Sequence, residues 1–173
     1  MHASTIQNLV GLCFQMETTL LLKTQHFGQY EPPEFEALTM HEKKAQAAMI
    51  MAKINRLPNL QRAVLWALHT RRETEMIYLT THTPCKYGFK TDLDIIRKWA
   101  TGKGPGCRDL GDRHGVHHTT LHRYGKKIIR QLEQAMHQAY AALEGPLGEI
   151  IRNLRYEPKQ SANINHPIQY SNA

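Results

Sequence analysis

Residues 107–127, CRDLGDRHGVHHTTLHRYGKK, constrain the fold more than any other part of this chain. Leu110 and Gly111 place an apolar and a small residue in a short first helix, which allows a second helix to cross close to it. Gly115 supplies the left-handed backbone conformation of a tight turn at the lowest steric cost. The residues that hold the second helix onto the first are Val116, Leu121 and Tyr124. The segment predicts a helix-turn-helix, and His114 is its one departure because an apolar residue is common at that position.

Apolar residues at helical spacing run through much of the remaining chain, which predicts a mainly α protein folded as a helical bundle. An N-terminal helix is expected within residues 4–24. Thr39 and Glu42 have the spacing of a capping box, which predicts a second helix from there to about Arg56. Pro58 interrupts that helix and precedes another one.

The longest predicted helix starts near His118 and ends at Gly145 and Pro146, because glycine and proline disfavour its continuation. Its predicted inward face repeats every three or four residues: Leu121, Tyr124, Ile128, Leu132, Met136 and Tyr140. This spacing is typical of a helix with one side in the core.

Residues 73–106 separate the helical segments and are predicted to form a small irregular or β insert. The sequence IYLTT at 77–81 is β-branched and aromatic, and the breakers in TPCKYGFK at 83–90 favour a loop or a small hairpin. Thr91 is expected to cap a short helix that TGKGPG at 101–106 ends.

The predicted organisation has four parts. They are an N-terminal helical segment at 1–30, a linker at 31–38, a helical DNA-binding domain at 39–157 and a flexible tail at 158–173. Within the domain, the helix-turn-helix occupies 107–130 and the insert occupies 73–106.

Positive charge concentrates at the predicted helix-turn-helix. From Arg97 to Arg130 there are nine Lys or Arg residues against Asp109 and Asp112, a difference of +7 that equals the formal net charge of the whole chain. A basic surface confined to such a unit is the pattern expected for contact with nucleic-acid phosphates. A solvated charged face without a ligand is the structural alternative.

The position of each polar side chain in the unit predicts its role. The first turns of a recognition helix face base edges in the major groove. The side chains expected there are His117, His118, Thr119, Thr120, His122 and Arg123, and the remaining predicted DNA-binding residues are Arg108, Arg113, Lys126, Lys127 and Arg130.

Among these residues, Arg123 is the best candidate for a bidentate contact with guanine. Lys126, Lys127 and Arg130 lie further along the helix and are expected to hold phosphates, as is Arg108 at the start of the first helix. Two of these residues could have a structural role instead of a role in DNA binding. Thr119 has the position of a helix cap, and His122 has that of an ordinary surface residue.

The sequence predicts neither an enzyme nor a resident metal or cofactor. The histidines of the segment have no Ser, Cys or carboxylate partner at catalytic spacing, and no H-E-x-x-H motif occurs. The three cysteines form no C-x-x-C pair, although a mixed zinc site can be drawn from His82, Cys85, Cys107 and His114. Buried or incidental thiols in a reducing compartment are the simpler interpretation.

Neither membrane insertion nor export is expected from the sequence. No apolar run approaches the roughly 18–20 residues that a membrane-spanning helix needs. The N-terminus lacks a basic region ahead of an apolar stretch and a small-residue cleavage site, which are typical of a secretory signal. With 41% hydrophobic residues, the chain has enough apolar material for a packed core.

The sequence KINRLPNLQRAVLWALHT, followed later by GVHHTTLHRYGKKI, resembles the conserved-region-four module of bacterial sigma factors. It also resembles the small, non-lambda branch of the Q-type late antiterminators of lambdoid phages. The resemblance covers about residues 42–145, and the chain departs from it in the insert at 73–106 and in its histidine-rich recognition helix.

The resemblance implies a sequence-specific protein that binds double-stranded DNA near a late promoter, in the cytoplasm of a bacterial host cell. It implies that this protein joins the bacterial RNA polymerase holoenzyme and lets transcription pass terminators. Under that implication, the N-terminal apolar helix and the long helix beyond Arg130 are the surfaces left for polymerase.

Other functions remain open on the sequence. One is an operator-binding repressor or activator that forms a homodimer through Leu132, Met136, Tyr140 and Leu143, although such a stripe more commonly packs within one chain. Another is the DNA-recognition subunit of a phage DNA-processing complex, since TTLHRYGKK is similar to the DNA-binding tail of serine recombinases. A purely structural interaction protein is the weakest interpretation.

Overall fold

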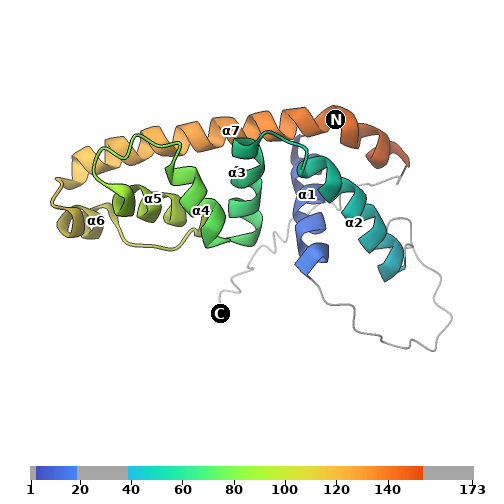
Figure 1. Cartoon of the computed structure of the whole chain (residues 1–173), viewed down its shortest axis with the longest axis horizontal. Helices are drawn as coiled ribbons and strands as arrows, with labels where there is room; N and C mark the ends of the chain where they lie inside the picture. The colour runs from blue at the N-terminus through green and yellow to red at the C-terminus, as the bar shows by residue number, and fades with distance from the viewer. Residues whose placement is uncertain (1–2, 19–38, 154–173) are drawn as a thin grey trace, which may run out of the picture.

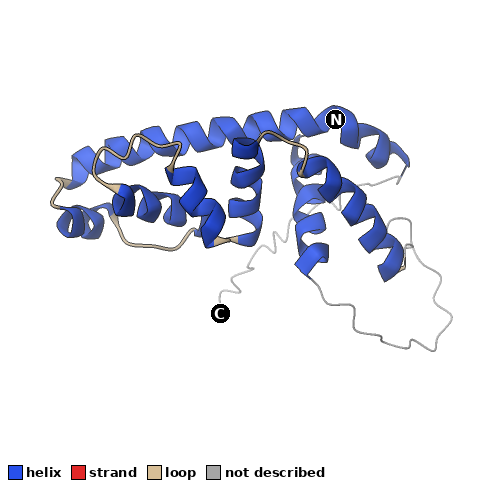
Figure 2. Ribbon diagram, viewed as in Figure 1, coloured by secondary structure: helices blue, strands red, loops and turns tan. Residues whose placement is uncertain are grey.

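The computed structural model describes residues 3–18 and 39–153, and within these ranges all regular structure is α-helical (Figure 2). The predicted linker at 31–38 and tail at 158–173 lie outside the described residues, as do the last positions, 19–30, of the predicted N-terminal segment. The helices are α1 (Ala3–Thr18), α2 (Met40–Ile54), α3 (Asn59–Thr70), α4 (Glu73–Thr80), α5 (Phe89–Thr101), α6 (Cys107–His114) and α7 (His118–Asn153). The prediction of a mainly α protein is confirmed.

Helix α7 runs the length of the molecule, and the other helices pack along it (Figure 1). Its 36 residues correspond to about 54 Å at the rise of an α-helix. Helices α3 to α6 lie along its N-terminal half, whereas α1 and α2 lie along its C-terminal half.

The predicted inward face of α7 is confirmed, and it is shared between two hydrophobic cores. The first core joins α3, α4, α5 and α6 to the N-terminal half of α7, where Leu121, Ile128 and Leu132 are buried. The second joins α1, α2 and Leu65 of α3 to the C-terminal half. Met136 packs against both cores.

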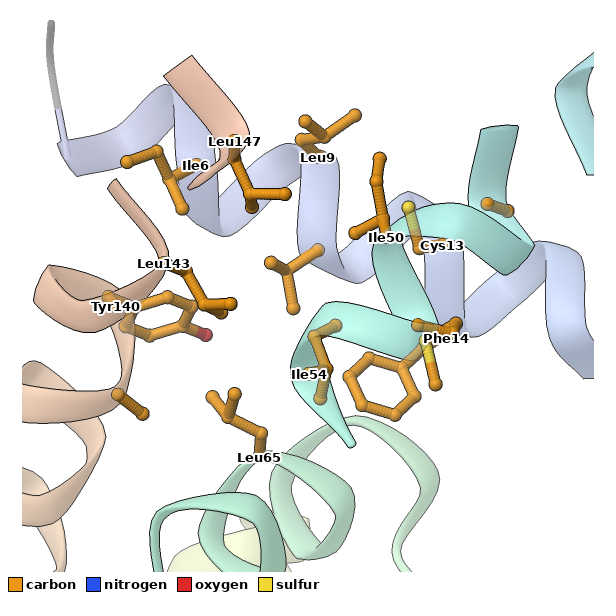
Figure 3. Packing of buried hydrophobic residues seen from close by; sticks show 14 residues of the cluster. Ile6, Leu9, Cys13, Phe14, Ile50, Ile54, Leu65, Tyr140, Leu143 and Leu147 are labelled. Atoms are coloured by element: carbon orange, nitrogen blue, oxygen red, sulfur yellow. The ribbon is translucent and has the colours of Figure 1, made fainter. Parts of the chain in front are cut away.

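The second core covers the apolar face of α1. Figure 3 shows Leu143 and Leu147 of α7 facing Ile6 and Leu9 of α1. The resemblance left the N-terminal helix as a surface for polymerase, and the structure shows that the chain itself covers the apolar face of this helix.

The stripe considered for a homodimer is also used within the chain. Leu132, Tyr140 and Leu143 are buried, and Met136 is half-buried between the cores. This stripe is therefore not available to pair two copies.

Several local predictions of helix ends are confirmed. The Thr39 hydroxyl accepts the backbone N–H of Glu42, and a Glu42 carboxylate oxygen lies 2.7 Å from the backbone nitrogen of Thr39, which completes the capping box. Pro58 stands immediately before α3. Gly102, in the left-handed conformation, ends α5 as the TGKGPG sequence predicted.

The insert was predicted as a loop or hairpin at 73–90, and this prediction is wrong for its first half. Residues 73–80 form α4, and the β-branched and aromatic sequence around Tyr78 belongs to this helix. Met76 and Leu79 lie three residues apart on one face and enter the first core. Tertiary burial therefore overrides the local β preference.

The expected start of the next helix is also wrong. Helix α5 begins at Phe89 rather than after Thr91, and Thr91 is buried within its first turn. The Thr91 hydroxyl donates to the carbonyl oxygen of Tyr87, so the side chain returns to the preceding loop instead of capping the helix.

Gly145 and Pro146 were expected to end the long helix, and α7 instead continues through both. Leu143 and Leu147, on either side of this pair, are both buried in the second core. Their burial favours an unbroken helix, while the proline can bend it by removing one backbone donor. The last turns of α7 do bend away from the main axis (Figure 1).

None of the helices in the described ranges combines the length and apolar character needed to cross a membrane.

Replacing Leu143 by alanine tests the importance of the second core. Leu143 is only 1% exposed, so Leu143→Ala should lower the free energy of unfolding by about 2–5 kcal/mol. Urea denaturation would measure the change. Glu144→Ala, at the next and exposed position, is the matched control and should shift it by no more than about 0.5 kcal/mol. Equal effects of the two variants would contradict the assigned packing.

His69 makes the stability of the second core dependent on pH. Its Nε2 atom lies 3.1 Å from the Tyr140 hydroxyl and its ring stacks on Phe14, and burial lowers the pKa of this histidine below its ordinary value of 6.5. Below that value the unfolded chain binds a proton that the folded chain resists, so the free energy of unfolding should fall as the pH decreases.

Urea denaturation between about pH 7.5 and about pH 5 would measure this dependence. The His69→Gln variant should show a flatter decline than the unmodified chain, whereas His137→Gln, at an exposed position of α7, should retain the full decline. The same pH dependence in all three proteins would disprove the role of His69.

Candidate nucleic-acid interface

Helices α6 and α7 are joined by the short turn Gly115–His117, where the sequence predicted it. Gly115 has a φ of 64°, which is the left-handed region that favours glycine. Its backbone N–H and that of Val116 both donate to the carbonyl oxygen of Gly111. These two bonds end α6 and direct the chain into α7.

Gly111 is required by the close approach of the turn to α6. A Cβ atom at this position would lie 2.6 Å from the carbonyl oxygen of Val116 and 3.4 Å from the backbone nitrogen of His118. Any side chain there would push α7 away from α6. The glycine therefore sets the distance between the two helices.

His114, the departure from the usual apolar pattern, is explained by the insert. Its Nε2 atom lies 3.3 Å from a carboxylate oxygen of Asp94 on α5, and its side chain is only 15% exposed. Asp94 also binds Arg97, which in turn pairs with Glu73 of α4. A polar residue is suitable at this position because the insert supplies a partner for it.

All of the predicted DNA-binding residues have exposed side chains. Two of them lie on α6, one in the turn and eight on α7: Arg108, Arg113, His117, His118, Thr119, Thr120, His122, Arg123, Lys126, Lys127 and Arg130. Their apolar neighbours Leu121 and Ile128 point into the first core instead. The same helix therefore separates core residues from polar surface residues.

Four cations form a continuous stripe on the outer face of α7. Arg123, Lys126, Lys127 and Arg130 follow the i, i+3, i+4, i+7 spacing that places side chains on one face of a helix. We call these four residues the basic stripe. In the part of the chain that the structure describes, none of them forms an ion pair. Their charge is therefore available to an external anion.

An open hollow of about 610 Å³ lies between the N-terminal ends of α6 and α7. Arg108 of α6 and Arg123 of α7 both line it, together with His118, Thr119 and His122. The Nδ1 atom of His122 lies 3.7 Å from the Cys107 sulfur, so this histidine faces α6. The hollow thus brings predicted residues of both helices together.

The start of α7 is organised by two neighbouring side chains. The carbonyl oxygen of His117 accepts the backbone N–H of Leu121, and its ring nitrogen Nδ1 lies 2.8 Å from the Thr119 hydroxyl. The rings of His117 and His118 are in contact, with centroids 4.4 Å apart. Thr119 is the second residue of α7 and bonds to the His117 ring rather than to a free backbone N–H, so it is not the helix cap, and its side chain is exposed.

Two of the cations counted in the basic segment hold the insert together. Arg97 forms its ion pairs with Glu73 and Asp94, and the Lys98 ammonium donates to the carbonyl oxygen of Pro105 at 2.8 Å. The charge count from the sequence thus included residues that have structural partners. Apart from Lys103 in the loop before α6, the remaining counted cations lie on α6 and α7.

The four residues from which a zinc site could be drawn do not come together. His82 contacts Thr81, Cys85 lies near Thr80, Cys107 lies beside His122, and His114 binds Asp94. Among the described residues, no group of three or more His, Cys, Asp and Glu side chains is arranged to hold a metal ion.

A buried carboxylate next to the stripe is a feature that the sequence did not predict. Asp92 is 0% exposed and accepts hydrogen bonds from the Tyr124 hydroxyl at 2.8 Å and from the Cys85 backbone N–H at 3.0 Å. Burial, reinforced by the Asp92 carboxylate, raises the pKa of Tyr124 to about 12, so this phenol remains a donor. Tyr124 was expected to act only as an apolar contact, and its partner lies 32 residues away in the sequence.

The chain matches no protein-family model, no curated protein and no solved structure.

Two glycine-to-alanine variants test the close approach of α6 and α7. Gly111→Ala would force the Val116 carbonyl to move, so it should lower the free energy of unfolding by about 1–3 kcal/mol. Gly125→Ala is the control, because its Cβ would lie 3.8 Å from Ile95, an ordinary contact. It should raise stability by up to about 1 kcal/mol through helix propensity. Urea denaturation that shows the opposite order would contradict the geometry.

Proposed function

We propose that this chain is a sequence-specific DNA-binding transcription regulator and that α6, the turn and the start of α7 form its DNA-reading helix-turn-helix. The observation that carries the proposal is the coincidence of the basic stripe with this unit. Arg123, Lys126, Lys127 and Arg130 lie on the outer face of α7 without ion-pair partners in the described residues. A continuous cationic face on the exposed side of a helix suits the phosphates of a duplex.

The proposed binding mode follows from which residues lie near the N-terminal end of α7. This end would enter the major groove, where Thr119, Thr120 and Arg123 would meet base edges. Lys127 and Arg130, one and two turns further along, would hold phosphates of the groove walls. Arg108 lines the same hollow from the side of α6. It would bind the phosphate backbone of the DNA beside the start of α6.

The more specific proposal is a phage antitermination factor that acts with bacterial RNA polymerase holoenzyme at a late promoter. It is supported by the resemblance of residues 42–145 to the small Q-type antiterminators and to sigma region four. Since the apolar face of α1 is covered, polymerase would meet the outer face of α7 beyond Arg130, where Glu133, Gln134 and His137 are exposed. The alternative of a dimeric operator-binding regulator is less well supported, because the stripe proposed for its dimer contact packs within one chain.

A binding-site selection tests the proposal. The full chain would be incubated with a library of genomic DNA fragments, and the retained fragments would be footprinted with and without RNA polymerase holoenzyme. Protection that polymerase extends or strengthens at a promoter would support the antitermination role. A symmetric site that polymerase does not affect would instead support an operator-binding regulator, and the absence of any enriched duplex would refute sequence-specific DNA binding.

Variants of two neighbouring cations test the division of roles. Arg123→Ala should cost about 1–3 kcal/mol on the selected duplex and relax the preference at one base pair. Lys127→Ala should weaken binding to selected and scrambled duplexes alike, and it should lower the salt dependence. Fluorescence anisotropy at several salt concentrations would measure both effects.

Arg56→Ala is the matched control, because Arg56 is exposed in the turn after α2, in the part of the chain that packs on the second core. It should bind as the unmodified chain does. If Arg123→Ala and Lys127→Ala affect selected and scrambled duplexes in the same way, the proposed roles are wrong.

A further inference from the structure

The loop at residues 81–88, which connects α4 to α5, lies against α7 next to the basic stripe. We call it the insert loop. Its Lys86 backbone N–H donates to the Tyr124 hydroxyl at 3.1 Å, and the Tyr87 ring meets the Tyr124 ring edge to face, with centroids 5.0 Å apart. Figure 1 shows the loop crossing the N-terminal half of α7.

Asp92 holds the insert loop in this position. Its buried carboxylate accepts hydrogen bonds from the Thr83 hydroxyl, the Cys85 backbone N–H and the Tyr124 hydroxyl. One carboxylate therefore ties two points of the loop directly to α7. A loop fixed in this way has little conformational entropy left to lose when it binds a partner.

The insert loop and α6 flank the basic stripe on opposite sides. Successive residues of a helix are rotated by about 100°, so Tyr124 and His122 lie on opposite flanks of the face that carries Arg123. His122 contacts Cys107 of α6, whereas Tyr124 contacts the insert loop. Lys127, one turn from Tyr124, is the stripe residue next to the loop.

The charge of the loop region has the same sign as that of the stripe. Residues 81–90 contain Lys86 and Lys90, both exposed, and no acidic residue. The nearest carboxylate along the chain, Asp92, is buried and turned toward the loop backbone. The side of the loop that faces solvent is therefore cationic.

We propose that the insert loop and the adjoining first turn of α5 form a second DNA-contacting element, in which Lys86 of the loop and Lys90 of α5 bind backbone phosphates beside the groove that α7 enters. This inference rests on the proposed DNA-binding function and extends it to the insert. Asp92 and Tyr124 act as positioning residues, because they hold the loop at the edge of the basic stripe. The duplex would then be contacted by α6 on one side of the recognition helix and by the loop on the other.

The alternative hypothesis, that the loop only covers the hydrophobic core, predicts a different result. Replacing exposed lysines would then leave the affinity for DNA and its salt dependence unchanged. The backbone N–H of Lys86, rather than its side chain, makes the bond to Tyr124, so Lys86→Ala keeps this bond and removes only the exposed contact of the ammonium with the Tyr87 ring.

The test compares the unmodified full chain with Lys86→Ala, Lys90→Ala and the double variant on the duplex that the unmodified chain selects. Loss of each phosphate contact should reduce the slope of log affinity against log salt concentration by about one. Hydroxyl-radical footprints should lose protection on one flank only. Lys86→Arg, which keeps the charge, should retain both the slope and the footprint.

Lys53→Ala, on α2 in the second-core half of the chain, is the control and should match the unmodified chain. If the lysine variants bind with an unchanged slope and footprint while the unmodified chain binds its duplex, the role of the loop is refuted and the proposed function stands. If the unmodified chain binds no duplex in a salt-dependent way, the proposed function and this inference both fail.

Discussion

Burial of the apolar face of α7 is the interaction on which the rest of the structure depends. This face extends from Leu121 to Leu147 and contributes to both hydrophobic cores. The other helices have between 8 and 16 residues, and helices this short are marginal in water without tertiary packing. Each of them gains its stability by packing on α7, on a helix that does so, or on both.

The candidate interface is a consequence of the same helix. Because α7 turns its apolar residues inward, Arg123, Lys126, Lys127 and Arg130 must lie on the opposite, outer face. Gly111 then sets how closely α6 approaches, and Asp92 sets where the insert loop lies. The basic stripe is thereby presented from a rigid support, which lowers the entropic cost of binding an extended partner such as a duplex.

Two of the incorrect predictions share one physical cause. The segment around Tyr78 has a local β preference, and Pro146 disfavours helix continuation, yet both positions are helical. In each case apolar neighbours, Met76 with Leu79 and Leu143 with Leu147, are buried in a core. The hydrophobic gain from a few buried side chains exceeds a local preference of about 1 kcal/mol, and it offsets much of the larger cost of a proline.

Three kinds of local signal predicted part of the structure correctly: hydrophobic periodicity, capping residues and the turn glycine. They predicted the helices from residue 39 to residue 70, the turn at Gly115 and the exposed face of α7. These features depend only on neighbours within one or two helical turns. The bonds from Asp94 to His114 and from Asp92 to Tyr124 depend instead on residues 20 and 32 positions apart. Such contacts arise only when separate helices pack together, since no local pattern encodes which side chains then meet. The placement of the insert loop beside the basic stripe therefore belongs to the folded structure alone.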